Sequence, residues 1–382
     1  MPSLYDKLKS AQPIIGSSRK KSAYQDCLIE QHRIHMGEVP ETLCSSQAFS
    51  YISNGAIQAG FSPESLLFID TETTGLSRGA GTVAFLIGFG QIQGQDLLIT
   101  QVLMRDYPQE SVLLNDLLGR IEAAQCLVTY NGSSFDLPLL QGRLTMNHLR
   151  YDLSAKPHLD LLHVARRIFK LRLGKCPLTR MEELIFGFIR DGDLPGAEMP
   201  GRYFSYLESQ DESLIRDILN HNCQDILTLA KLFVHISGMH QNPLNTLYQQ
   251  DLFSLGRVYE QQGHQSRAIA CYKACSDRTV IDLARLRMAE LYRRQKMDQE
   301  AVEQFEALRQ GVAVNARIFI SLAKIYEHRF HEPCRALEIT RQGMLYCSER
   351  LGFSPKKDPD YLDLQRRCLR LMRKVEKFRE ID

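Results

Sequence analysis

The stretch FIDTETTG, residues 68–75, ends an apolar run with two acidic residues two positions apart. Successive side chains of a β-strand point to opposite faces, so Asp70 and Glu72 share one face of the strand predicted here. Their charges repel each other, and protons, arginines or divalent cations can offset that repulsion. Hard cations such as Mg²⁺ prefer carboxylate oxygens. Taken alone, the pair also fits an ordinary surface strand end, so other residues have to decide between these interpretations.

The sequence around this stretch predicts a mixed α/β domain. Three strand-like runs, LLFID, TVAFLIGFGQI and DLLITQVLM, are separated by glycine-containing turns and predict an antiparallel meander. Helical spacing follows in QESVLLNDLLGRIEA, then a strand in CLVTYNG and a helix in FDLPLLQGRLTMNHL. After the proline- and glycine-bearing stretch DGDLPGAEMPG, a long helix is expected over residues 211–237.

Two further acidic residues strengthen the metal interpretation. Asp136 follows a predicted strand in YNGSSFD, directly after Phe135. Asp225 lies in HNCQD on the predicted long helix, with His221 one turn earlier on the same face. Considered separately, Asp136 could be a helix N-cap and His221 an ordinary surface histidine.

Together, these residues resemble the DEDD family of 3′→5′ exonucleases, whose fold is ribonuclease H-like. Four blocks are similar to recurrent blocks of the YprB-type branch over about residues 62 to 240: FIDTETTGLSRGAGTVAFLIGFG, LVTYNGSSFDLPLL, PHLDLLHVARR and GDLPGAEMPGRYFSYL. The resemblance implies an α/β ribonuclease H-like domain with a mixed sheet, in which an antiparallel meander precedes parallel strands flanked by helices. It also implies metal-dependent 3′→5′ hydrolysis of phosphodiester bonds in single-stranded DNA or RNA by a two-metal-ion mechanism.

The resemblance assigns roles position by position. It makes Asp70, Glu72, Asp136 and Asp225 the carboxylates that bind two Mg²⁺ or Mn²⁺ ions. His221 takes the place of the general base, because a neutral imidazole near pH 7 can accept a proton from water. The chain departs here from the better-known subgroups, which have a Tyr four residues, or a His five residues, before the last Asp. This chain has a His at the tyrosine spacing.

Substrate contacts also follow from the resemblance. Thr73 and the backbone near Gly75 and Leu76 would hold the terminal nucleotide. Phe135 either stacks on a base or belongs to the core, and Asn131 either shapes a turn, which we favour, or touches the substrate. Asp160 is expected either to support the metal ligands from behind or to be structural, and His158 and His163 have no thiol at the spacing of a zinc site. A basic run over residues 166–180 is expected to follow the nucleic-acid backbone through Arg166, Arg167 and Lys170.

Composition limits the other classes of function. The 382 residues carry a net charge of only +2, which predicts no global attraction to nucleic acid. The apolar stretch VAFLIGFG is too short to span a membrane, so a cytoplasmic protein without membrane contact is expected. The ten scattered cysteines predict reduced thiols. GFGQIQG and GLSRGAG fit no nucleotide-binding motif, so their glycines are expected in tight turns, with Gly79 and Gly81 leaving room for substrate.

The last third of the chain repeats itself. Tyr259, Tyr292 and Tyr326 are 33 and 34 residues apart, the period of a tetratricopeptide repeat, with small residues at 256, 289 and 323. The alternative is a plain helical bundle. The predicted organisation is a lead-in or arm over 1–60, the ribonuclease H-like domain over 61–240 and the tetratricopeptide-like domain over 245–382, which could bind a protein partner.

One rival from another functional class stays open. In it, a catalytically silent ribonuclease H-like domain binds nucleic acid while the repeats recruit a protein. The presence of all four clustered acidic residues argues against this rival, because a scaffold has no need of repulsive charge. The sequence does not distinguish DNA from RNA as substrate, and it leaves processivity, pathway and oligomeric state undetermined.

Overall fold

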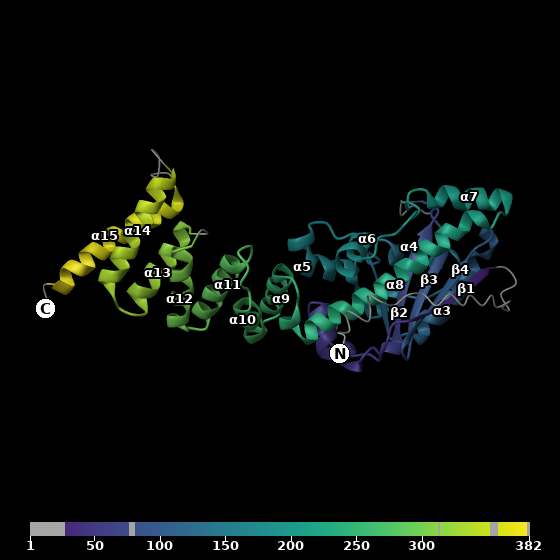
Figure 1. The fold of residues 1–382 in the computed structure, drawn as a ribbon, viewed down its shortest axis with the longest axis horizontal. Coiled ribbons are helices and arrows are strands. Elements are labelled where there is room, and N and C mark those ends of the chain that lie inside the picture. Colours follow the sequence, from purple (N-terminus) through teal and green to yellow (C-terminus); the bar gives the residue numbers. More distant parts are fainter. Residues whose placement is uncertain (1–26, 76–80, 312–313, 352–357, 380–382) are drawn as a thin grey trace. The chain divides into compact units, whose positions relative to one another are not determined.

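The computed structural model describes residues 27–75, 81–311, 314–351 and 358–379, and the chain separates into two compact units, Met1–Thr246 and Leu247–Asp382 (Figure 1). The first unit is built on a six-stranded sheet with the order β1-β4-β3-β2-β5-β6. Its strands are β1 (Leu28–His35), β2 (Leu66–Thr73), β3 (Ala84–Gln93), β4 (Asp96–Leu103), β5 (Cys126–Thr129) and β6 (His158–Asp160).

The pairing of these strands confirms the predicted mixed sheet. β2, β3 and β4 form an antiparallel meander, while β5 pairs parallel to β2 and β6 parallel to β5. The sequence analysis did not foresee β1, which pairs antiparallel with β4 within the segment expected to be a lead-in. Its sequence, LIEQHRIH, is polar over its centre because an edge strand buries less of its surface.

Helices cover both faces of the sheet. The helical elements of this unit are η1 (Glu41–Cys44), α2 (Ser46–Ile52), η2 (Pro63–Ser65), η3 (Tyr107–Gln109), α3 (Glu110–Ala123), α4 (Asp136–Met146), η4 (Leu153–Ala155), α5 (Leu161–Leu173), α6 (Leu178–Met181), the π-helical η5 (Glu182–Phe186), α7 (Met199–Ser209), α8 (Ser213–Gln241) and η6 (Pro243–Asn245). The long α8, expected over 211–237, runs along the sheet in Figure 1 and contacts β2, β3 and β4. On the other face, Arg120 of α3 lies over the ring of Phe89 at 4.6 Å.

Two glycines of β3 let α8 approach the sheet closely. A Cβ at Gly88 would lie 2.2 Å from Oδ1 of Asn222, and one at Gly90 would lie 2.6 Å from Cγ2 of Ile226. The expectation that the glycines of GFGQIQG serve tight turns is therefore wrong for these two positions. It holds for Gly94, which has φ +63° in the turn between β3 and β4.

The second unit consists of helices in the part of it that the structure describes. They are α9 (Gln249–Gln261), α10 (Gln265–Lys273), α11 (Ile281–Arg294), α12 (Asp298–Arg309), α13 (Ala316–His328), α14 (Pro333–Leu351) and α15 (Pro359–Arg379). The repeated tyrosines are buried at equivalent places in α9, α11 and α13. A Cβ at Gly256 would lie 2.6 Å from Cε1 of Tyr272, so the small residue permits close contact between α9 and α10. Assignment to the tetratricopeptide class stays a prediction.

Along the described ranges, we find no helix with both the length and the apolar character that crossing a membrane requires.

Candidate active site

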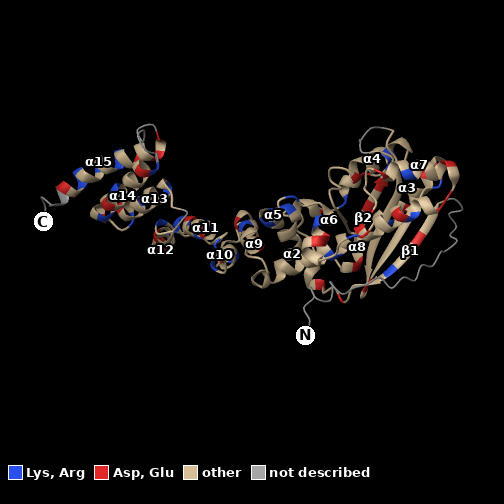
Figure 2. Cartoon of the chain, turned by 45° about the horizontal axis from the view of Figure 1, so that its top comes forward, with Lys and Arg blue, Asp and Glu red and all other residues tan. Residues whose placement is uncertain are grey.

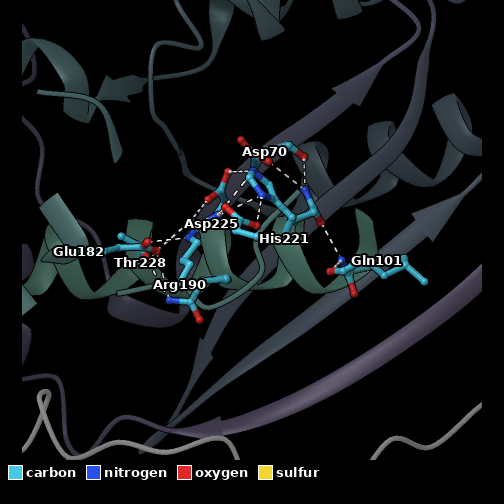
Figure 3. A network of polar contacts seen from close by, with 11 residues as sticks. Asp70, Gln101, Glu182, Arg190, His221, Asp225 and Thr228 are labelled. Atoms are coloured by element: carbon cyan, nitrogen blue, oxygen red, sulfur yellow. Dashed lines mark hydrogen bonds and ion pairs between the residues drawn. The ribbon is translucent and has the colours of Figure 1, made fainter. Parts of the chain in front are cut away.

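β2 and α8 supply the centre of the candidate site. The β2–β3 ladder pairs Asp70 with Gly88 and Glu72 with Leu86, and its register shifts after Glu72. Between the two acids, Thr71 is buried. The opposite wall is the middle of α8, where His221 and Asp225 are one turn apart. Figure 2 shows the acidic residues of β2 among the mostly uncharged strands, and Figure 3 shows α8 beside them.

Three of the predicted residues meet closely. In the described ranges, Glu72, His221 and Asp225 are the one group of potential metal ligands in which an atom of each lies within 4.8 Å of the others. Nε2 of His221 lies 3.4 Å from Oδ2 of Asp225. Glu72 thus meets two side chains of one helical face, His221 and Asp225, which follow it by 149 and 153 positions in the chain.

Asp70 is held beside this group by Asn222. The amide Nδ2 of Asn222 donates to Oδ2 of Asp70 at 2.9 Å, and its Oδ1 accepts a hydrogen bond from Nε2 of Gln101 at 2.9 Å. Asn222 is fully buried, so these bonds fix its orientation. The pKa of Asp70 is raised well above its ordinary value by burial and by the charges of Asp225, Glu72 and Asp136.

Asp136 enters the site from another element. It is the first residue of α4, and its Oδ1 accepts a hydrogen bond from the hydroxyl of Thr71. Burial raises the pKa of Asp136 to about 6, against the lowering effect of the Thr71 hydrogen bond. Its charge raises the pKa of both Asp70 and Glu72, but Asp136 is not a member of the group within 4.8 Å.

The electrostatics divide the carboxylates into two kinds. Burial raises the pKa of Glu72 to about 8, although the nearby His221 opposes this shift. The pKa of Asp225 is lowered: burial would raise it, but the hydrogen bond with His221 and the charge of Arg190 prevail. The pocket therefore favours ionised Asp225 and penalises ionised Asp70 and Glu72.

His221 differs from the expectation of a neutral imidazole near pH 7. Burial lowers its pKa, but Asp225, Asp193 and Glu72 together raise it to about 9. Asp225 and Glu72 were predicted as metal ligands, but their effect on the pKa of the imidazole was not part of that prediction, and Asp193 was not predicted at all. Without bound cations, the same carboxylates stabilise the imidazolium form.

Besides Asn222, sequence reasoning missed Arg190 and Asp193, which also contact this centre. Arg190 contacts Oδ1 of Asp225 through NH2, and Asp193 Oδ1 lies 2.7 Å from Nδ1 of His221 (Figure 3 labels Arg190). Both residues lie in the segment between η5 and α7, which includes the start of DGDLPGAEMPG. Charged residues in this otherwise loop-like stretch are the only signal that the sequence offered.

Comparison with known proteins identifies the family of the chain. A family model described as RNase_H superfamily matches residues 67–237. The uncharacterized protein YprB of Bacillus subtilis (strain 168) is 30% identical over 303 residues, which cover 77% of this chain and 73% of YprB. The chain belongs to the YprB family. This confirms the predicted resemblance.

A solved structure is also similar over part of its length. The family B DNA polymerase from the hyperthermophilic archaeon Pyrobaculum calidifontis aligns with a TM-score of 0.37 and 13% identity. The alignment covers 65% of this chain and 30% of the polymerase chain.

Within the YprB-type domain, the loop after β5 is fixed by Asp160. This buried carboxylate accepts hydrogen bonds from the backbone N–H groups of Asn131 at 2.8 Å and Ser133 at 3.1 Å, and caps α5 through Leu162 N at 3.0 Å. Asn131 has φ +67°, as a residue that shapes a turn can have. Phe135 is half-buried and lies next to Asp136. Asp160 thus has the structural role expected of it.

The structure describes only some of the other predicted substrate contacts of the YprB-type domain, and these differ in exposure. The hydroxyl of Thr73 donates to the carbonyl of Gly75 at 2.9 Å, which shapes the end of β2, and Leu76 lies outside the described residues, as does Gly79. Arg166 and Lys170 are exposed on α5. Arg167 instead donates to the carbonyl of Ile52, and burial lowers its pKa. The structure therefore assigns Arg167 to packing between α5 and α2, not to the exposed basic surface.

Proposed function

We propose that this protein is a divalent-metal-dependent 3′→5′ exonuclease acting on single-stranded DNA or RNA. The observation that carries the proposal is the meeting of Glu72, His221 and Asp225 within 4.8 Å, with Asp70 beside them. The RNase H superfamily domain indicates a nuclease, and the arrangement of acidic residues supports the narrower activity.

The residues present fit divalent cations. Asp70, Glu72, Asp136 and Asp225 would together hold two Mg²⁺ or Mn²⁺ ions, since all four offer the oxygen ligands that hard cations take. Burial, followed by the charges of neighbouring carboxylates, raises the pKa values of Asp70, Glu72 and Asp136, so their ionised forms need added positive charge. Bound cations would supply that charge, activate a water molecule and stabilise charge on the leaving 3′ oxygen.

His221 is placed to accept the proton of the attacking water. Its Nδ1 lies beside the carboxylate of Asp193, which leaves Nε2 on the side of Asp225. Asp225 and Glu72, two of the three carboxylates that raise the imidazole pKa, are proposed cation ligands. Neutralising them would lower that pKa toward the range where a histidine works as a base.

A pocket of about 450 Å³ is lined in part by Arg190 and Asp193, which contact Asp225 and His221, and we propose it as a path for the strand. Arg190 and Asp193 line it on the side of the catalytic group, together with Arg180 and the exposed apolar residues Phe188 and Ile189. An exposed ring stacks on bases of any sequence, and exposed cations attract phosphates. We propose that the strand continues toward Arg166 and Lys170 on α5, while Thr73, Gly75, Leu76, Asn131 and Phe135 surround the terminal nucleotide.

The organisation of the chain is part of the proposal. Residues 61–240 would form the exonuclease domain, to which the strand 28–35 adds an edge. Residues 245–382 would form a tetratricopeptide-like domain that binds a protein partner, because stacked helix pairs expose an extended surface.

Digestion of end-labelled DNA and RNA oligonucleotides tests the activity. The wild type and Asp70→Ala are compared with Mg²⁺, with Mn²⁺ and with a chelator. The proposal expects mononucleotides from the 3′ end, cation dependence and loss of activity in the variant. Internal fragments would identify an endonuclease instead, and binding without cleavage would identify the scaffold.

A further inference from the structure

We infer that Glu182 and Arg190 form a buried brace that fixes the orientation of Asp225 for cation binding and stays in place in the working site. The inference rests on the proposed function, because it assigns Asp225 to a bound cation. It adds two positioning residues, neither of which belongs to the proposed set of ligands.

The brace is a two-pronged ion pair. Nε of Arg190 donates to Oε2 of Glu182 at 2.6 Å, and Nη2 of Arg190 donates to Oε1 of Glu182 at 2.8 Å. The side chains are only 9% and 2% exposed, so water competes little for these bonds. Paired bonds between a planar guanidinium and a carboxylate fix direction as well as distance.

Glu182 is in turn tied to the helix that carries Asp225. The hydroxyl of Thr228 donates to Oε1 of Glu182, and Nε2 of Gln224 donates to the same oxygen at 3.1 Å. Gln224, Asp225 and Thr228 all lie on α8, whereas Glu182 begins the π-helical turn η5. Figure 3 shows Glu182, Thr228 and Arg190 together on one side of Asp225.

Arg190 then selects which oxygen of Asp225 faces the site. Its Nη2 contacts Oδ1, while Oδ2 is 3.4 Å from Nε2 of His221, a member of the group that includes Glu72. A carboxylate free to rotate would present either oxygen. The brace keeps Oδ1 in contact with Arg190, which leaves Oδ2 available to His221 and to a bound cation.

An alternative is that Arg190 occupies the place of a cation and leaves when the cation binds. Glu182 argues against this alternative. Departure of Arg190 would leave a carboxylate that is 2% exposed without its counter-charge, and an uncompensated buried charge is strongly unfavourable. Glu182 therefore favours an Arg190 that remains in place when a cation binds.

The test measures Mn²⁺ binding to the full chain by calorimetry, without substrate. Arg190→Met should weaken Mn²⁺ binding roughly 10- to 100-fold, as loss of residues that orient ligands does, and Arg190→Lys should recover only part of it. Glu182→Gln keeps the shape of the side chain and should weaken binding in the same direction. Arg150→Ala removes an exposed arginine after α4 that belongs to no proposed site; it is the control and should bind as the wild type does.

Unchanged or tighter Mn²⁺ binding by a folded Arg190→Met protein overturns the inference, and tighter binding would identify Arg190 as the displaced occupant. Should Arg190→Met not fold by circular dichroism, Glu182→Gln decides in the same way. A wild type that binds no Mn²⁺ also overturns it. Failure of the proposed function looks different: Mn²⁺ binding would follow the expected order, but no oligonucleotide would be cleaved.

Discussion

Oδ1 of Asp193 lies 2.7 Å from Nδ1 of His221, so a carboxylate from the segment before α7 orients the imidazole of α8. Nη1 of Arg190 is 3.1 Å from Nδ1 of His221 as well. A carboxylate can only accept a hydrogen bond, so the shorter contact indicates that Nδ1 carries a proton and donates it to Asp193. The lone pair of neutral His221 is then on Nε2, toward Asp225.

This orientation predicts the effect of Asp193→Ala. Loss of the carboxylate should lower kcat by about tenfold or more and leave KM nearly unchanged, within the roughly 10²- to 10⁴-fold that a general base contributes. His221→Ala sets the upper limit of the effect. Asp191→Ala removes an exposed acid of the same segment and should behave as the wild type. A kcat equal to that of the wild type in Asp193→Ala would contradict the orienting role.

The raised pKa of Glu72 predicts how the metal-free protein responds to pH. The folded-state pKa of about 8 exceeds the ordinary value of 4.5, so folding disfavours the ionised form. The free energy of unfolding should therefore fall as pH rises from about 5 to 8, by up to a few kcal/mol. Urea unfolding in a chelator measures this slope, and saturating Mn²⁺ should reduce it.

Glu72→Gln supplies the variant for that measurement. An amide does not ionise, so the slope between pH 5 and 8 should become shallower and stability at pH 8 should increase. Glu64→Gln, at an exposed acid just before β2, serves as the control. Equal slopes for Glu72→Gln and the wild type would show that folding does not raise the pKa of Glu72.

The two kinds of arginine on α5 predict different outcomes. Replacing exposed Arg166 and Lys170 together by Ala should make the salt dependence of oligonucleotide binding shallower by about 1.4, since each phosphate contact on a single strand contributes about 0.7. Arg167→Ala should leave that slope unchanged and lower stability, because its guanidinium bonds the carbonyl of Ile52. Fluorescence anisotropy over a salt series, with urea unfolding, separates the two. An identical slope in the double variant would remove α5 from the binding surface.

Stacking in the pocket predicts the effect of Phe188→Ala. This ring is 45% exposed, and stacking on a base contributes about 1–3 kcal/mol. KM for single-stranded oligonucleotides should rise about tenfold, with little change in kcat. Phe204→Ala on α7 removes a ring of similar exposure, 42%, and is the matched control. Equal KM values for both variants would place the strand elsewhere.

Close packing of α8 on β3 predicts that Gly88→Ala is destabilising. The new Cβ would lie 2.2 Å from Oδ1 of buried Asn222, whose amide also holds Asp70. Unfolding by urea should show a loss of about 1–3 kcal/mol, the usual cost of overpacking. Gly119→Ala, on α3 with open space around it, should be neutral or stabilising. A Gly88→Ala protein as stable as the wild type would mean that α8 can move away from the sheet.

Most of the fold of the first unit could be predicted from periodicity. The meander strands and β5 are visible in the sequence as apolar runs and α8 as a helical period, whereas the parallel pairing of β5 was implied by the resemblance. Strand β1 was missed, because an edge strand with Glu30 and Arg33 at its centre lacks that pattern. Gly88 and Gly90 were misread, because the sequence shows a missing side chain but not the helix that fills its space.

By itself, the sequence determined which side chains share a face: Asp70 and Glu72 through the strand period, and His221 and Asp225 through the helix period. Their chemical roles were predicted from the resemblance. Only the tertiary structure decided what surrounds them. Arg190 and Asp193 reach the site because the segment before α7 folds back onto α8, a contact between residues 28 to 35 positions apart. Periodicity reports which face of one element is buried. It does not report which charges of other elements meet there, and these charges add to the effect of Asp225 on the pKa of His221 and fix the orientation of Asp225.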